Sequence, residues 1–524
     1  MSGIGFVTRR RFLGEVGAGM LLAGLGPEVL CALDLPAPRL DRDDDRLDFG
    51  TLEPLVRLMQ ETPADKILAA CVEKLRSGTA LDKLIAAAAL ANARTFGGED
   101  YIGYHCEMAL MPARFMASRM PDPRLAALPV LKVIHRNTTR IHEKGGREHE
   151  VLRRLPKAAP SAADPAPLLA AERKGDVAAA EAAFGGLVSQ FVDVAGRPEL
   201  VFNAMQELIR DHIDVHQVVL AWRAYDLRTV TGPEHMHTLL RQSVRHCVMN
   251  EAGRVRDGSA SPSIRDLLPR LIDEHRLSMG APPRSEPPVP DASIDAMART
   301  IFSATRDEAA RAVAAALRAE FGFLATRDAI MLASVRLLLH DPGQTKESTG
   351  KPVGSVHGAS IGVHGSDSAH AWTRIAEATT CPVTAATLVT AAWHTAGQSG
   401  RMDRENPVHA SARPRAKAVA AKDIPGAIEE SIRGRDQAAS AALVERYGAL
   451  GLDPAPLIEK LLAHAVEHDG ALHHEKFFAT AVEGFAEARP AFRFEYLAAL
   501  TRVLASGYGF EAPGLKEARE RLLA

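Results

Sequence analysis

With 524 residues, the chain is long enough for about two to four domains of ordinary size. Its composition, 46% hydrophobic and 24% charged, is typical of a globular protein and excludes wholesale disorder. The formal net charge of −2 argues against nucleic acid as a partner, and five cysteines exclude a disulfide-rich scaffold. The 20 histidines are the unusual feature of the composition.

Residues 1–33 have the parts of an export signal. Arg9 and Arg10 precede Phe12 and Leu13, and a short apolar run follows over residues 16–25. The arginine pair is typical of the twin-arginine (Tat) class, whereas the glycines around the run disfavour the alternative of a basic amphipathic helix. We therefore expect the Tat translocation machinery to be a partner, and the protein to be periplasmic or extracellular.

The rest of the chain lacks the signals of a membrane span and of covalent haem. No segment reaches the ~18 uninterrupted apolar residues of a spanning helix, so no permanent membrane span is expected. No Cys-x-x-Cys-His motif is present, which excludes a covalently attached c-type haem.

Helical periodicity runs through the chain from residue 53. Apolar residues recur at spacings of three and four, as in Ile67, Leu68, Cys71 and Leu75. Strand-like alternation over five or more residues is hard to find. The sequence therefore predicts an all-α protein, a multi-helix bundle or an irregular array of helical hairpins. The predicted helices cover 64–76, 81–93, 101–119, 124–143, 176–195, 197–209, 211–228, 234–250, 262–277, 292–302, 305–320, 326–340, 367–379, 382–396, 424–448, 454–468, 475–488 and 490–506.

Proline-rich segments suggest the domain organisation. Residues 34–52 are predicted to be a polar linker after the signal, and residues 279–291 a Pro-rich linker between two helical lobes. These boundaries place an N-terminal lobe at 53–278 and a C-terminal lobe at 292–524.

Histidines concentrate in two places. His216 lies on an apolar helix that a Gly-Pro turn joins to a second helix, so the two helices could bring His216 to face His235 or Arg241. In segment 350–372, five glycines surround His364, and a helix capped by Ser366 or Asp367 would carry His370 in its first turn. Free N–H groups at such a glycine-rich helix start also form an anion site. The alternative is that these histidines lie on the surface or bond to backbone carbonyls.

Several short stretches resemble a family of bacterial Tat-exported helical proteins that are distantly similar to the questin oxidase-like proteins of fungal aromatic-polyketide pathways. They are residues 104–107 (Tyr-His-Cys-Glu), His216 with Gly232, His235 and residues 239–241, and residues 363–371. The chain departs from the pattern at Ser366-Asp367, Tyr225-Asp226 and His135. The resemblance implies a helical fold and an oxygenation such as Baeyer–Villiger chemistry.

Together these features predict a metal- or haem-dependent oxidoreductase with a histidine-lined pocket for a small-molecule substrate. His105, His216, His235 and His364 are the expected ligands, because imidazole suits Fe, Cu or Zn and a helical bundle can supply one ligand per helix. Non-covalent haem is the alternative cofactor. Arg241 and His370 are the expected catalytic groups, and the amides of Gly362 and Gly365 are expected to bind the cofactor. The competing hypothesis is a non-catalytic periplasmic helical binding or assembly protein.

Export should depend on the paired arginines. We expect the double substitution Arg9→Lys, Arg10→Lys to prevent export, because the Tat pathway recognises the arginine pair. Fractionation of cells into cytoplasm and periplasm measures this. Appearance of the natural chain in the periplasm of a strain lacking only the Tat pore would contradict the prediction.

Overall fold

The computed structural model describes residues 45–155, 164–194, 196–210, 214–279, 288–319, 321–348, 350–358 and 360–524. The predicted signal at 1–33, most of the linker at 34–52 and residues 280–287 of the Pro-rich linker lie outside the described residues. The predictions made for those segments therefore stay predictions.

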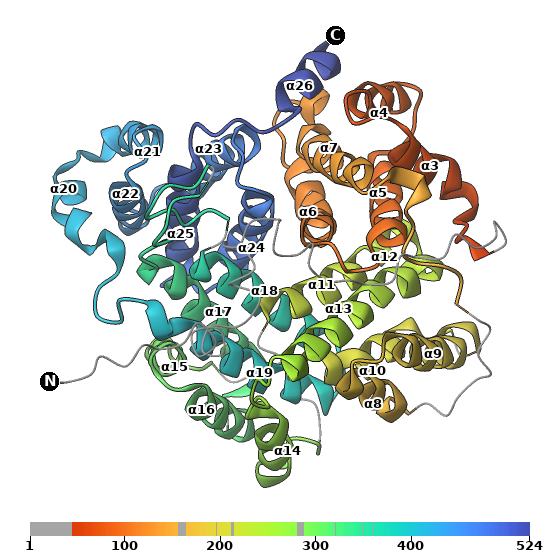
Figure 1. Ribbon diagram of the computed structural model, residues 1–524. Helices are drawn as coiled ribbons and strands as arrows, with labels where there is room; N and C mark the ends of the chain where they lie inside the picture. The colour runs from red at the N-terminus through yellow and green to blue at the C-terminus, as the bar shows by residue number, and fades with distance from the viewer. Residues whose placement is uncertain are drawn as a thin grey trace, which may run out of the picture.

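The described residues form an all-α structure, as the apolar periodicity predicted (Figure 1). Their only β features are three isolated bridges. The helices before the predicted lobe boundary are α3 (Glu53–Glu61), α4 (Ile67–Arg76), α5 (Leu81–Phe96), α6 (Tyr101–Ala117), α7 (Leu128–Glu143), α8 (Ala166–Lys174), α9 (Val177–Val188), α10 (Pro198–Arg210), α11 (Val215–Asp226), α12 (Arg228–Thr231), α13 (Met236–Arg256) and α14 (Ile264–Glu274).

The helices after that boundary continue the all-α pattern. They are α15 (Asp291–Ser303), α16 (Arg306–Arg318), α17 (Gly322–His340), α18 (Ile361–Ala378), α19 (Val383–Gln398), α20 (Arg413–Ala418), α21 (Ile424–Arg433), α22 (Gln437–Ala449), α23 (Pro454–Glu467), α24 (His473–Glu487), α25 (Arg493–Gly507) and α26 (Leu515–Leu523). Among the described helices, none combines the length and apolarity needed to cross a membrane.

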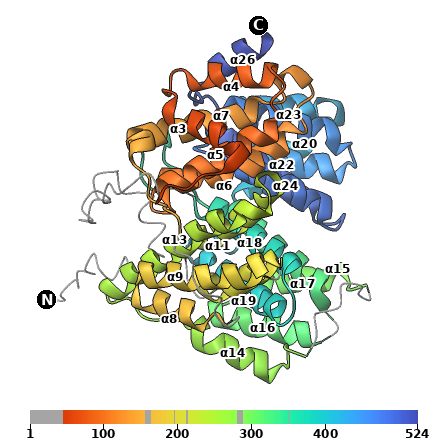
Figure 2. The ribbon, with the colours of Figure 1, turned by 90° about the vertical axis from the view of Figure 1, so that its right-hand side faces the viewer.

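Helices from both sides of the predicted lobe boundary share one hydrophobic core, which extends along the chain from Phe49 to Ala518. The last helix, α26, packs against α4 and α7, so the C-terminal end of the chain lies beside its first helices (Figures 1 and 2).

Four helices form a closed ring at the centre of the molecule. α6 packs against α11, α11 against α18, α18 against α24, and α24 against α6. Along α18 and α24 the paired residues advance together, from His364–His473 to Asp367–Lys476 and then His370–Glu483. These two helices therefore run in the same direction.

The other two helices of the ring follow that direction. His105 lies beside His473 and, ten residues further along α6, Phe115 contacts Phe478 of α24. On α11, His216 lies beside His364, and Asp226 at the far end is close enough to His370 for that imidazole to influence its pKa. All four helices thus begin at the same end of the ring, and we call this arrangement the parallel bundle.

Local sequence explains why these helices begin where they do. Asp100, Asp214 and Ser360 precede α6, α11 and α18, and each accepts a hydrogen bond from a backbone N–H of the first turn. Such caps satisfy donors that have no partner inside the helix. The bundle histidines consequently lie in or just after the first turn of their helices.

A glycine sets the close packing of α18 against α17. A Cβ at Gly362 would lie 2.5 Å from the Cα of Leu338, so no larger residue fits without moving α17. Gly426 in α21 is the contrasting case, because a Cβ there would meet no atom within 4 Å.

We expect Gly362→Ala to lower the free energy of unfolding by about 1–3 kcal/mol, the usual cost of overpacking. Gly426→Ala is the matched control and should raise it by about 0.5–1 kcal/mol, because alanine is the better helix former. Denaturant unfolding of both variants measures the difference. Equal stability of the two would contradict the close α17–α18 contact.

Candidate metal centre

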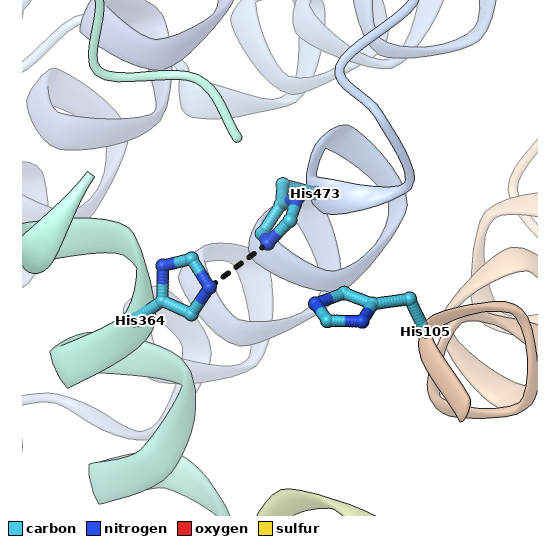
Figure 3. A group of neighbouring side chains, drawn as sticks. All are labelled: His105, His364 and His473. Atoms are coloured by element: carbon cyan, nitrogen blue, oxygen red, sulfur yellow. Dashed lines mark hydrogen bonds between the residues drawn. The ribbon is translucent and has the colours of Figure 1, made fainter. Parts of the chain in front are cut away.

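Four histidine side chains meet at the first turns of the parallel bundle. His105 of α6, His364 of α18 and His473 of α24 are all buried, and each offers a nitrogen within 4.8 Å of those of the other two (Figure 3). His216 of α11 completes the group, with its ring centroid 4.8 Å from that of His105 and 5.2 Å from that of His364. Each helix of the bundle therefore contributes one imidazole. We call these four side chains the histidine cluster.

The Nδ1 atom of every imidazole in the cluster has a fixed oxygen acceptor. His105 bonds to the carbonyl of Tyr101 at 2.7 Å, His364 to that of Ser360 at 2.8 Å and His473 to that of Ala471 at 2.9 Å. The Nδ1 of His216 lies 2.8 Å from a carboxylate oxygen of Asp214. Because a carbonyl oxygen only accepts, Nδ1 must carry the proton, and the lone pair of a neutral ring is then on Nε2.

The Nε2 atoms are left without suitable partners inside the protein. Those of His105 and His216 are buried and have no hydrogen-bond partner. Those of His364 and His473 face one another at 3.3 Å (Figure 3). Two lone pairs at this distance repel, whereas a cation between them would attract both. Imidazoles oriented through Nδ1 by a backbone or carboxylate oxygen are the usual arrangement around a protein-bound metal.

Burial keeps three imidazoles of the cluster in the protonation state that a metal requires. It lowers the pKa of His105, His364 and His473 well below the usual 6.5, and the nearby ammonium of Lys476 lowers each further. The three rings are thus neutral at pH 7, as ligands must be.

Asp214 orients His216 and is itself held by α13. Its carboxylate accepts hydrogen bonds from the backbone and Nδ1 of His216 and from the amide of Asn250, and His246 lies 3.5 Å away. Burial alone would raise the pKa of this carboxyl, but His216 and His246 outweigh that effect and hold it well below its usual value. A permanently ionised carboxylate therefore supports the cluster.

Two tyrosines enclose the cluster on the α6 side. The Tyr101 ring lies 4.3 Å from the His105 ring, and the Tyr104 ring stacks on His105 at 5.1 Å. Burial raises the pKa of both phenols, so both stay protonated and uncharged. The cluster consequently lies in surroundings that exclude bulk water.

His235 and Arg241, two of the predicted site residues, do not reach the cluster. His235, half-buried at the end of a short 3-10 turn (Pro233–His235), packs against Phe49 with ring centroids 5.5 Å apart. Arg241 forms an ion pair with Glu181 at 2.6 Å and donates to the carbonyl of Arg153. The physical reason lies in hairpin geometry. His216 lies at the start of α11. In an antiparallel hairpin, the start of the first helix packs against a distant part of the second helix, here around His246 of α13, and not against the residues next to the turn.

The glycine-rich segment also differs from its predicted form. α18 begins at Ile361 with Ser360 as its cap, so Ser366 and Asp367 lie inside the helix instead of capping it. The N–H of Gly362 donates to Asp341 at 2.7 Å, and Gly365 packs on Leu337, so neither glycine forms an open anion cradle.

The structure places His370 in the same bundle but beyond the cluster. It lies six residues after His364 on α18, and its Nε2 is 2.7 Å from Glu483 of α24. It therefore lies nearer the far end of the bundle than the four clustered imidazoles.

Sequence reasoning missed His473. The predicted helix began at residue 475, whereas α24 begins at His473, so the histidine fell outside the predicted stripe. The signal was present, because His473 and His474 directly precede an apolar helical pattern.

Comparison with known proteins finds no family model that matches the chain, and no match among curated proteins or solved structures. The chemistry of the site is therefore inferred from its own geometry and donor atoms.

The buried histidines should make the metal-free protein sensitive to mild acid. Below pH 6.5 these histidines are protonated in the unfolded chain but stay neutral in the folded chain. The free energy of unfolding therefore falls as the pH falls. We expect the free energy of unfolding to fall by up to about 1.4 kcal/mol per pH unit for each histidine that is protonated only in the unfolded chain. Urea unfolding in the presence of a chelator between pH 7.5 and 5 measures the slope. The double substitution His364→Gln, His473→Gln should flatten it, and an unchanged slope would contradict the assignment.

Proposed function

We propose that this protein is a metal-dependent oxidoreductase whose transition-metal ion is bound by His105, His216, His364 and His473. The observation that carries the proposal is the orientation of the cluster. All four imidazoles have Nδ1 engaged by an oxygen, and nitrogens of His105, His364 and His473 lie within 4.8 Å of one another, with the ring of His216 beside them. Nitrogen donors of this kind suit Fe, Cu or Zn.

The spacing fits a single ion after a small contraction. Metal–nitrogen bonds of ~2.0–2.1 Å require nitrogens about 3–4 Å apart. The 4.8 Å limit of the three-histidine group and the 3.3 Å between His364 and His473 are close to that range. The same spacing does not fit haem, because ring centroids about 5 Å apart leave no room for a porphyrin among the four imidazoles.

The direction of the four helices adds to the chemistry of the site. The N-terminal end of a helix carries a partial positive charge, and here four such ends meet at the cluster. Because the imidazole ligands are neutral, they do not cancel the charge of a divalent ion. Both effects favour negative charge that develops on a molecule bound at the ion.

Oxygen transfer is the reaction class that we propose. A redox-active ion held by the cluster would supply dioxygen activation. The chain's own residues fix the ligands, through Asp214 and three backbone carbonyls, and exclude water through Tyr101 and Tyr104. The resemblance of residues 104–107, His216 and 363–371 to the questin oxidase-like proteins supports this class, and makes aromatic ketones suitable probe substrates.

We also propose that the protein works in the periplasm or outside the cell. The support is the Tat-like sequence of residues 1–33. Since the Tat pathway exports folded chains, a buried ion would be inserted before export.

Metal content tests the proposal directly. Protein purified without a histidine tag and loaded with Fe(II), Cu(II) or Zn(II) should bind about one ion per chain, measured by mass spectrometry of the metal. We expect His105→Ala, His364→Ala and His473→Ala each to weaken binding at least tenfold. His235→Ala is the matched control and should keep the full metal content, because His235 lies against Phe49.

Dioxygen consumption by the iron- or copper-loaded protein with an aromatic ketone then separates an enzyme from a binding protein. A two-electron donor such as ascorbate is added, because one oxygen atom enters the ketone and the other is reduced to water. A natural chain that binds no ion would overturn the proposed function, as would His235→Ala losing the ion while His473→Ala keeps it. Full metal content without any turnover would favour the alternative of a non-catalytic binding protein.

A further inference from the structure

Arg223 is a buried arginine with unused hydrogen-bond donors. It lies on α11, and only 5% of its surface is exposed. Its Nε and Nη2 atoms are both buried and have no hydrogen-bond partner. The nearest carboxylate, that of Asp226, lies 3.6 Å from Nη1, beyond the range of a good hydrogen bond.

The position of Arg223 directs it into the parallel bundle. It follows His216 by seven residues, so it lies on the same face of α11, two turns or roughly 10 Å further along the axis. Its guanidinium lies toward the far end of the bundle, because Nη1 is 3.6 Å from Asp226, three residues further along α11, and the group is close enough to Glu483 of α24 to lower the pKa of that carboxyl. Across the bundle it is close enough to Lys476 of α24 to lower the pKa of that buried amine.

The other charges of this region are already engaged. Lys476 faces Asp367 with 3.8 Å between Nζ and the carboxylate oxygen. Glu483 accepts from His370 and from Arg374, and Arg374 also binds Glu377 and Glu487. The edge of Arg223 formed by Nε and Nη2 is therefore the part of this charged group that has no partner.

Two charged donors that are buried without a partner destabilise the folded chain, and a bound anion would remove that cost. Nε and Nη2 lie on one edge of the planar guanidinium. That edge matches the two oxygens of a carboxylate, with two parallel hydrogen bonds.

We propose that Arg223 binds the anionic group of the substrate, a carboxylate or an oxyanion of similar shape, inside the parallel bundle. The inference rests on the proposed function, because the histidine cluster defines where the rest of the substrate reacts. The substrate is then an acid whose anionic group lies about two helical turns, roughly 10 Å, from the reacting atom. Neutral analogues bind poorly, because they leave Arg223 unpaired.

Thermal unfolding and calorimetry with benzoate, inorganic phosphate and the neutral analogue benzamide test the proposal on the metal-loaded full chain. We expect benzoate or phosphate to raise the melting temperature of the natural protein, and benzamide to leave it unchanged. Arg223→Met should weaken binding of the effective anion at least tenfold, and Arg223→Lys should weaken it less. Without anion, Arg223→Met should lower the melting temperature, because it leaves the partly buried carboxylate of Asp226 without its cation, so affinities are compared at a temperature where both proteins are folded.

Arg241→Met is the matched control. Arg241 is 6% exposed, but its ion pair with Glu181 is complete, so its loss should lower the melting temperature and leave anion affinity unchanged. The proposal is overturned if neither benzoate nor phosphate stabilises the natural protein, or if either stabilises Arg223→Met equally. Metal content measured on the same samples keeps this result separate from the proposed function, because a chain with a full ion and no anion affinity fails only here.

Discussion

Four helices that begin at one place, each carrying a histidine at or near its start, are the constraint on which the rest of this protein depends. Helices that run in the same direction cannot be joined by short turns, because the chain must return to the starting end each time. The remaining helices make those returns. α7–α10 lead from α6 to α11, α12–α17 from α11 to α18, and α19–α23 from α18 to α24. A small site thereby requires a large all-α chain, whose returning helices form the surrounding core.

The aligned helix starts also carry an electrostatic cost. Four positive dipole ends repel one another, and the cluster adds no negative ligand to offset them. Asp214, the cap of α11, provides compensating charge beside His216, whereas Asp100, the cap of α6, is paired with Arg140. Asp214 also holds His216, so one carboxylate both caps a helix and orients an imidazole of the cluster.

The sequence predicted the class of fold and much of the cluster, for a physical reason. A helix that buries one face has apolar residues at spacings of three and four, so the helices could be predicted from the sequence without knowing how they pack. His105, His216 and His364 stood out because each interrupts an apolar or glycine-rich pattern. His473 was missed through a two-residue error in where α24 begins, and local sequence defines helix ends poorly. His235 and Arg241 were expected in the cluster because they follow His216 closely, yet an antiparallel hairpin brings its distant residues, here His246, to the start of the first helix.

The packing of α26 against α4 and α7 has a consequence for the order of events in the cell. The first helices are made long before α26, the helix that packs against them. The cluster likewise lacks His473 until about nine-tenths of the chain has been made. The histidine cluster is therefore complete only when almost the whole chain has been made. Its assembly coincides with the packing of the last helices against the first.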